Sequence, residues 1–243
     1  MIWEYTDNDA FKGDLAMMDL LSTNKWDRPV YISTTVPSTQ YKGLEKFFVQ
    51  EGITYRIVPI KTDKPEDGEF GMIDPAEMYD NMMNKYKWGN AADPSVYLDE
   101  NNKRMLSNFR RLFGNLGKAL LASGDTTKAV EAAHRGLEIV PAEKLPYDFF
   151  VLGLAEVLLR AGEEEEGNKV LNDVMKYSKE YLDYAISMDP DKQFGMDYPI
   201  GINMQTLLDI NNAAINLKMD ELVKTVSSDV NKYYSILYSG KQN

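Results

Sequence analysis

The strongest constraint on the fold is a helix–turn–helix pattern that recurs along the C-terminal part of the chain. Apolar residues at helical spacing predict three pairs of helices, at about 101–122 with 126–139, 147–161 with 164–188, and 203–217 with 219–237. Gly124-Asp125 interrupts the first pair and Gly162 the second, and these two glycines are 38 residues apart. Helix pairs that recur at such intervals stack, because one pair cannot bury its apolar face alone. The sequence therefore predicts a helical array.

The first pair contains the clearest unit of this array. Residues 110–143 closely resemble a tetratricopeptide repeat. Gly117 lies in the middle of the first helix and has no side chain, so we expect the partner helix to approach closely there. Ala129 and Ala133 are small residues that we expect to face the first helix. Pro141 is expected to end the second helix.

The second pair is a degenerate copy of the first. It occupies residues 148–188, and Leu154-Ala155 aligns with Leu116-Gly117. Its second helix is predicted to continue unusually far, to about Met188. The third pair keeps the helical pattern but loses the repeat motif, as expected of the polar-faced cap that such arrays need.

The resemblance to tetratricopeptide repeats implies a partner-binding groove, because in such repeats the first helix of each pair lines the concave face. The alignment places six residues toward that groove: Arg111, Lys118, Ala122, Leu152, Glu156 and Arg160. Two or three basic side chains there would bind a carboxylate of a protein or peptide partner. The alternative is that the long C-terminal helices of the chain itself fill the groove.

The N-terminal part has a different pattern. Runs rich in β-formers at 29–34 and 54–60 flank an apolar-faced segment at 41–52, which predicts strand, helix and strand in a parallel β-α-β unit. Residues 61–75 are rich in Asp, Gly and Pro and predict a loop. We therefore expect an α+β protein, with a small α/β unit over 1–75 and a tetratricopeptide-like helical domain over 76–243.

Composition excludes several functional classes. The net charge of −11 disfavours a nucleic-acid partner, which requires clustered Lys and Arg. The absence of cysteine removes disulfides and thiolate chemistry, and the single histidine, His134, rules out a multi-histidine metal site. His134 is expected to be exposed, without an implied partner. No apolar run reaches the roughly 18–20 residues of a membrane span, and the acidic N-terminus is not a signal peptide.

The loop that follows the first predicted strand is rich in hydroxyl groups. A phosphate or a sugar hydroxyl could bind to four of its side chains: Ser33, Thr34, Ser38 and Thr39. Alternatively, Ser38 or Thr39 simply caps the following helix. The loop lacks a glycine-rich fingerprint, and the Gly117-Lys118 pair lacks the other residues of a phosphate-binding loop. We predict no cofactor.

A second candidate ligand loop spans residues 88–101. Its aromatic, amide and carboxylate side chains suit ring stacking and hydrogen bonding to a sugar, and the candidate residues are Trp88, Asn90, Tyr97 and Asp99. In the alternative interpretation, Trp88 and Tyr97 hold the loop on the α/β unit, and Asp99 caps the helix that begins near 101.

The segment around Asp189, Asp191 and Asp197 contains an Asp-x-Asp pair, which can bind a divalent metal. Gly195 is displaced from the position that a calcium loop requires, and no Glu closes the loop. The spacing favours a turn, and we predict no metal.

Three stretches carry a resemblance to a family of membrane proteins. They are residues 26–61, 78–105 and 119–141, and the resemblance extends over roughly 10–190. They resemble the soluble C-terminal part of the DUF2723 proteins of Bacteroidetes, which are related to protein O-mannosyltransferase-like enzymes with a multi-spanning catalytic half. The chain contains no such half, so no catalytic residue carries over.

The resemblance implies an accessory domain of a glycosyltransferase system on the periplasmic face of the inner membrane. Its partners would be an acceptor protein and a multi-spanning membrane half. Two alternatives stay open. One is an enzyme or a saccharide- or phosphate-binding domain, which would use loops 33–40 and 88–101. The other is a spacer that docks on its membrane half.

Overall fold

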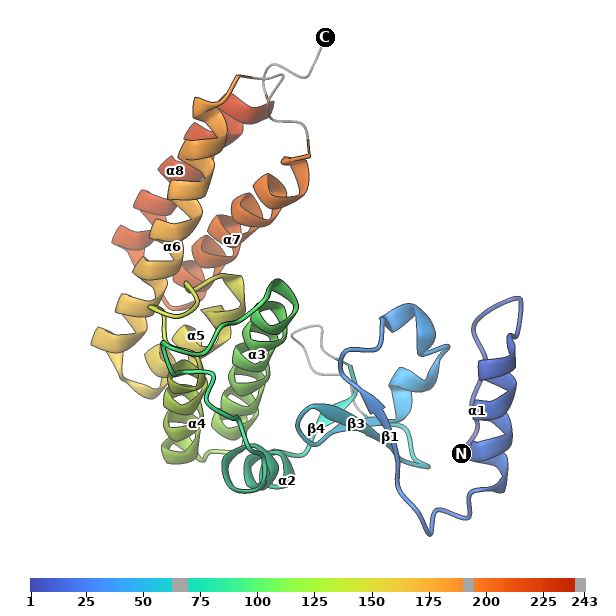
Figure 1. Cartoon of the computed structure of the whole chain (residues 1–243). Helices are drawn as coiled ribbons and strands as arrows, with labels where there is room; N and C mark the ends of the chain where they lie inside the picture. Colours follow the sequence, from blue (N-terminus) through green and yellow to red (C-terminus); the bar gives the residue numbers. More distant parts are fainter. Residues whose placement is uncertain (63–69, 190–194, 239–243) are drawn as a thin grey trace. The chain divides into compact units, whose positions relative to one another are not determined.

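The computed structural model of the chain describes residues 1–62, 70–189 and 195–238. It forms two compact units, Met1–Tyr86 and Lys87–Asn243, drawn in Figure 1. The first contains a four-stranded sheet, and the regular structure among the described residues of the second is helical, which confirms the α+β class. The boundary follows Tyr86 rather than residue 75, because two short helical segments after Asp74 belong to the first unit.

The sheet of the first unit has the strand order β1-β3-β2-β4. Its strands are β1 (Val30–Ser33), β2 (Phe48–Gln50), β3 (Thr54–Ile57) and β4 (Met72–Ile73). β3 pairs antiparallel with both β1 and β2, and β2 pairs parallel with β4. The predicted parallel β-α-β unit is therefore wrong, since the two predicted strands pair directly and antiparallel.

The segment predicted as a helix over 41–52 explains this difference. It forms two short 3₁₀ turns, η1 (Ser38–Gln40) and η2 (Leu44–Phe47), and then continues as strand β2. Gly52 has a φ of +131°, which only glycine adopts readily, and it forms the hairpin turn between β2 and β3. Phe48 and Val49 favour a strand and are both buried in the centre of the sheet.

An aromatic core holds the sheet to the rest of the unit. Phe48 and Tyr55 stack on adjacent strands with ring centroids 5.0 Å apart, and Tyr41 meets Phe48 edge-on at the same separation. Helix α1 (Lys12–Thr23) contributes Leu21 to this core. Aromatic pairs of this kind stabilise a core beyond their burial alone.

Two short helical segments complete the first unit. Helix α2 (Pro75–Tyr79) begins at the Asp74-Pro75 pair, where Asp74 Oδ1 accepts a hydrogen bond of 3.0 Å from the Glu77 amide. It continues as a π-helical turn, η3 (Asp80–Lys85). Met78 and Met82 of these segments are fully buried, so here methionine is part of the core.

The second unit consists of helices in the predicted order. They are α3 (Glu100–Ala122), α4 (Thr126–Ile139), α5 (Leu152–Ala161), α6 (Glu164–Ser187), α7 (Asp197–Asn216) and α8 (Asp220–Tyr238). α5 follows a 3₁₀ turn, η4 (Phe149–Val151), and so begins later than predicted. α7 begins earlier than predicted, because Pro199 lies in its first turn, where no amide hydrogen is needed.

Glycines determine how closely these helices cross. A Cβ on Gly114 would lie 3.1 Å from the backbone of Gly153 in α5, and a Cβ on Gly117 would lie 2.8 Å from Val157. Gly117 thus permits a close approach as predicted, but the neighbour at this position is α5, the first helix of the next pair. Gly124 and Gly162 have φ values of +86° and +93° and end α3 and α5, which confirms both turns.

The third pair departs from regular stacking. α7 packs mainly against α6 and α8, along the C-terminal half of the long α6. Polar contacts fix α8 there: Lys179 Nζ lies 2.7 Å from Asp229 Oδ2, and the Tyr233 hydroxyl donates to Asp183 Oδ1 at 2.9 Å. The C-terminal helices therefore extend the array along α6.

Candidate functional site

The face shared by α3 and α5 brings three of the predicted groove residues together. Lys118 Nζ of α3 lies 2.9 Å from Glu156 Oε2 of α5. Arg160 Nη2, one turn further along α5, lies 2.6 Å from Glu156 Oε1. Glu156 is largely buried and each of its oxygens pairs with one cation, so this carboxylate joins the two first helices.

The other three groove residues surround this ion-pair cluster. Nε and Nη2 of Arg111 donate to Asn108 Oδ1 at 3.1 and 3.0 Å. Leu152 is half-buried in α5, whereas Ala122 is exposed at the end of α3. The six residues thus combine one carboxylate, three cations and two apolar side chains.

This arrangement changes the predicted chemistry of the groove. A carboxylate of a partner must compete with Glu156 for Lys118 and Arg160, or use the positive charge that remains on the cluster. The alternative in which the C-terminal helices fill the groove finds little support, because α7 and α8 pack on α6.

The hydroxyl-rich loop of the first unit divides into two parts. Ser33 Oγ and Thr35 Oγ1 are 2.8 Å apart, and Thr34 Oγ1 donates to the Ile53 carbonyl at 3.1 Å. Ser33 and Thr34 thus serve local structure. Ser38 and Thr39 begin a 3₁₀ turn whose N-cap is Pro37, without a side-chain capping bond, so the capping interpretation is wrong.

Ser38 and Thr39 instead line a cavity of about 660 Å³ in the first unit. Lys42 and Lys46 also line it, together with Asp7, which forms an ion pair with Lys42. Hydroxyl groups beside lysines suit a polar ligand such as an anion or a sugar.

The second candidate loop belongs to the helical unit. The Trp88 ring packs on Phe109 and Phe113 of α3, with centroids 5.1 and 5.3 Å apart. Trp88 therefore has a structural role, in which it holds the loop on α3. Tyr97 is 87% exposed and does not anchor the loop.

Asp99 and Asn90 of this loop also have structural roles. Asp99 Oδ1 accepts a hydrogen bond of 2.8 Å from the Asn102 amide, which confirms Asp99 as the cap of α3. The Asn90 carbonyl accepts from the Asp93 amide at 3.0 Å. Lys144 adds an anchor that the sequence did not predict, because its Nζ donates to the carbonyls of Asp93, Pro94 and Val96.

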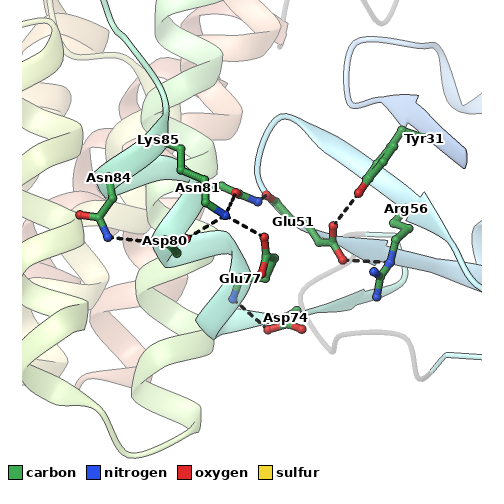
Figure 2. Close-up of polar contacts among 9 residues, drawn as sticks. All are labelled: Tyr31, Glu51, Arg56, Asp74, Glu77, Asp80, Asn81, Asn84 and Lys85. Carbon is green, nitrogen blue, oxygen red and sulfur yellow. Dashed lines mark hydrogen bonds and ion pairs between the residues drawn. The ribbon is translucent and has the colours of Figure 1, made fainter. Parts of the chain in front are cut away.

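The first unit also contains a buried carboxylate that the sequence pattern did not indicate. Glu51 follows β2 at the hairpin turn, and its side chain is only 5% exposed. Figure 2 shows the Tyr31 hydroxyl donating to Glu51 Oε2, at 3.3 Å, and Arg56 Nε beside Oε1 at 3.0 Å. The Arg56 contact has the distance of an ion pair but not the directions of a hydrogen bond.

Burial raises the pKa of Glu51 above its usual value of 4.5, and Arg56 opposes this shift. The backbone of the same residue holds the following helical segment, because Asn81 Nδ2 donates to the Glu51 carbonyl at 2.8 Å. Lys85 in turn lies 3.2 Å from Glu77 and 2.8 Å from Asp80. The cluster in Figure 2 therefore joins the hairpin to η3 through polar contacts.

Arg110 forms a corresponding polar centre in the second unit. It is fully buried, and its guanidinium donates to the carbonyls of Val140, Leu145 and Pro146 at 2.5, 2.7 and 3.1 Å. It also lies over the Tyr147 ring at 4.9 Å. Arg110 thus fixes the connection between α4 and α5. The sequence pattern of the repeat did not predict this role.

The sequence also led to predictions about His134 and about the acidic segment that contains Asp191. The His134 side chain is 41% exposed, and its Nε2 lies 2.8 Å from Glu166 Oε2 of α6, a contact that the sequence did not imply. Asp191 lies outside the described residues. Among the residues that the structure does describe, no three acidic or histidine side chains gather as a metal site would require.

Comparison with known proteins identifies one related domain. A family model described as TMEM260-associated domain 2 matches residues 1–77, which make up most of the first unit. Neither a curated protein nor a solved structure matches the chain. Within the described residues, we find no helix with both the length and the apolar character needed to cross a membrane.

Proposed function

We propose that the chain is a non-catalytic accessory domain that binds a protein partner through the face shared by α3 and α5. The observation that carries this proposal is the ion-pair cluster Lys118–Glu156–Arg160, which spans both first helices. The cluster presents fixed charges on the array, and the C-terminal helices α7 and α8 pack on α6. Stacked helix pairs create extended concave surfaces that bind partners.

The proposal extends to the system in which the domain acts. The resemblance to DUF2723 proteins supports an accessory domain of a membrane glycosyltransferase system, and the family model that matches residues 1–77 is itself described as a domain associated with another protein. The domain would lie at the periplasmic face of the inner membrane, beside a multi-spanning half or partner. The α3/α5 face would then recognise the acceptor protein or that partner.

A crosslinking pull-down tests this function. We would compare the wild-type chain with a Lys118→Gln/Arg160→Gln variant, which loses two charges but keeps hydrogen-bond donors for Glu156. The matched control is Lys128→Gln/Arg135→Gln, which removes two ion-paired cations from α4. Periplasmic extract and solubilised inner membrane would supply the partners.

The proposal predicts that the wild-type chain and the α4 control recover the same proteins and that the α3/α5 variant loses them. Equal recovery by all three chains would contradict it. Recovery of membrane protein alone, equal with each chain, would favour a docking or spacer role.

The 660 Å³ cavity of the first unit supports a second candidate function, binding of an anion or a saccharide. Loop 88–101 adds no support to this candidate function, because Trp88 and Asp99 have structural roles in the helical unit. Calorimetric titration with inorganic phosphate and with glucose would test it, using wild type and Ser38→Ala/Thr39→Ala. Heat of binding that disappears in the variant would support the candidate, and no heat from either ligand would contradict it.

A further inference from the structure

The N-terminal segment Trp3–Asp7, which we call the strap, contacts one residue of the 660 Å³ cavity in three ways. Trp3 Nε1 donates to the Lys42 carbonyl at 2.9 Å, and the Thr6 amide donates to the same oxygen at 3.3 Å. The Asp7 carboxylate forms an ion pair with Lys42 Nζ. The strap therefore places a carboxylate of the chain itself in the wall of the cavity.

The two ends of the strap differ in how firmly they are held. Trp3 packs against the aromatic core of the first unit, whereas Thr6 and Asp7 are exposed. The strap contains no helix or strand. Segments with few buried contacts open locally at little cost in free energy. The end that carries Asp7 can therefore move away from the cavity while Trp3 stays in place.

Two lysines supply positive charge to this cavity. The Lys42 side chain is only 13% exposed and already holds the Asp7 carboxylate, so its position accepts an oxyanion. Lys46 also lines the cavity, and we find no ion pair for it within the described part of the chain. Once Asp7 has moved away, the two lysines face a single carboxylate in the cavity wall, Glu45, and the net charge is positive.

The backbone beside Lys42 has the geometry of an anion-binding nest. Tyr41 is right-handed helical, with φ −76° and ψ −27°, and Lys42 follows in the left-handed region at φ +52°. Successive residues in these two conformations form a concavity of amide groups that attracts anions. A residue other than glycine rarely adopts the left-handed conformation, and strain of this kind is concentrated at functional sites. Tyr41, Lys42 and Gly43 all line the cavity.

The cavity wall favours a phosphate group over an uncharged sugar. The Tyr41 ring is buried and meets Phe48 and Phe70 edge-on, so it offers no open face for a sugar ring to stack on. Its hydroxyl donates to the Val36 carbonyl at 3.0 Å. Recognition must then come mainly from charge, and lysine binds phosphate as a point charge.

The volume of the cavity indicates the size of the ligand. Sites for small molecules enclose roughly 300–1,000 Å³, and about 660 Å³ is available here. A phosphate ion alone would leave most of this space empty. The hydroxyl groups of Ser38 and Thr39 in the cavity wall can form hydrogen bonds with the organic part of a larger ligand.

We propose that the cavity binds a small phosphate ester, and that the phosphate of this ligand replaces the Asp7 carboxylate beside Lys42. Asp7 is then a built-in competitor, which balances the charge of Lys42 when no ligand is bound. The inference rests on the second candidate function, which it deepens by naming the ligand class and a regulatory residue. It is independent of the α3/α5 face, which belongs to the other unit.

Calorimetric titration with glucose 6-phosphate tests the inference, and glucose and inorganic phosphate serve as the two separate parts of this probe. The wild-type chain should bind the ester more tightly than either part. Asp7→Asn removes the charge of the competitor and should tighten binding of the ester by about fivefold or more. The matched control, Asp9→Asn, removes the same charge outside the cavity and should stay within about twofold of wild type.

Two further variants test the cations. Lys42→Gln and Lys46→Gln should each weaken binding of the ester by about tenfold or more, and circular dichroism would verify that both fold. Vesicles of phosphatidylglycerol represent the other source of a phosphate group. They should not displace the ester at equal phosphate concentration, and displacement would overturn the inference by assigning the site to a lipid headgroup.

Two results would overturn the inference and leave the second candidate function intact. In the first, the wild-type chain binds the ester, but Asp7→Asn binds it no more tightly. In the second, glucose binds as tightly as glucose 6-phosphate, which would assign the cavity to a saccharide. No heat of binding from any probe with any of these chains would contradict both the inference and the candidate function.

Discussion

Gly114 of α3 and Gly153 of α5 meet backbone to backbone, so that a Cβ built on Gly114 would lie 3.1 Å from the Gly153 Cα. This contact brings the two first helices of the array unusually close. One turn beyond it, Lys118 and Glu156 form their ion pair of 2.9 Å. The backbone contact at Gly114 and Gly153 and the charged cluster therefore lie on the same two helices.

Replacing Gly114 by alanine should separate these helices. The neighbouring atoms are backbone and cannot rotate away, so we expect a loss of about 1–3 kcal/mol in the free energy of unfolding. Urea denaturation measures it. The matched control is Gly201→Ala in α7, where a Cβ meets nothing within 4 Å. That change should stabilise the helix by about 0.5–1 kcal/mol, and equal effects at both sites would contradict this account.

Arg110 should be essential for the connection between α4 and α5. Arg110→Met keeps an unbranched side chain but removes one buried and two partly buried hydrogen bonds to carbonyls, which should cost about 3–5 kcal/mol. Thermal denaturation would show the loss. Arg104→Met removes an exposed arginine of the same helix and should change stability by less than about 0.5 kcal/mol. A tolerated Arg110→Met would show that the connection is held in another way.

Glu51 should give the first unit a measurable pH dependence. Because the pKa of Glu51 in the folded state lies above its usual value of 4.5, the folded state binds the proton more tightly than the unfolded state. Its stabilising contribution is therefore complete below pH 4.5 and is lost as the pH rises through the folded-state pKa. Glu51→Gln removes this titration.

The measurement compares the free energy of unfolding of wild type and Glu51→Gln at pH 5 and at pH 7.5. The free energy of unfolding of wild type, relative to that of Glu51→Gln, should be larger at pH 5 than at pH 7.5. A difference that does not change with pH, or that favours wild type more at pH 7.5, would show that the Arg56 ion pair outweighs burial.

Trp88→Ala should act through stability. The indole packs on Phe109 and Phe113, and loss of a large, partly buried ring should cost about 2–4 kcal/mol. Tyr97→Ala, in the same loop, should be nearly neutral because that side chain is exposed. Chemical denaturation of both variants distinguishes this role from a ligand site, in which Trp88→Ala would fold normally and lose only binding.

Local rules explain why the helical unit was predictable. The turn at Gly124 and the caps at Asp99 and Asp125 are encoded within a few residues of each helix end, and the apolar periodicity determines the rest. The sheet was not predictable in this way, because β1 pairs with β3 across an intervening segment that forms 3₁₀ turns and a strand. Pairing between distant strands leaves little trace in a local pattern.

The same limit applies to the candidate sites. Lys118, Glu156 and Arg160 followed from the repeat alignment, but the sharing of one carboxylate by two cations depends on the closeness of α3 and α5. The burial of Glu51 depends on the hairpin between β2 and β3, whereas the sequence pattern predicted a helix over residues 41–52.

Site-specific photo-crosslinking tests the central claim most directly, that the face shared by α3 and α5 binds a protein partner. A photoreactive residue would replace exposed Ala122 at the end of α3, and a matched one would replace exposed Glu138 on α4. The account predicts that one set of partner proteins crosslinks from position 122, that the same set is lost with Lys118→Gln/Arg160→Gln, and that position 138 captures none of it. Equal crosslinking from both positions, or capture from position 138 alone, would contradict it.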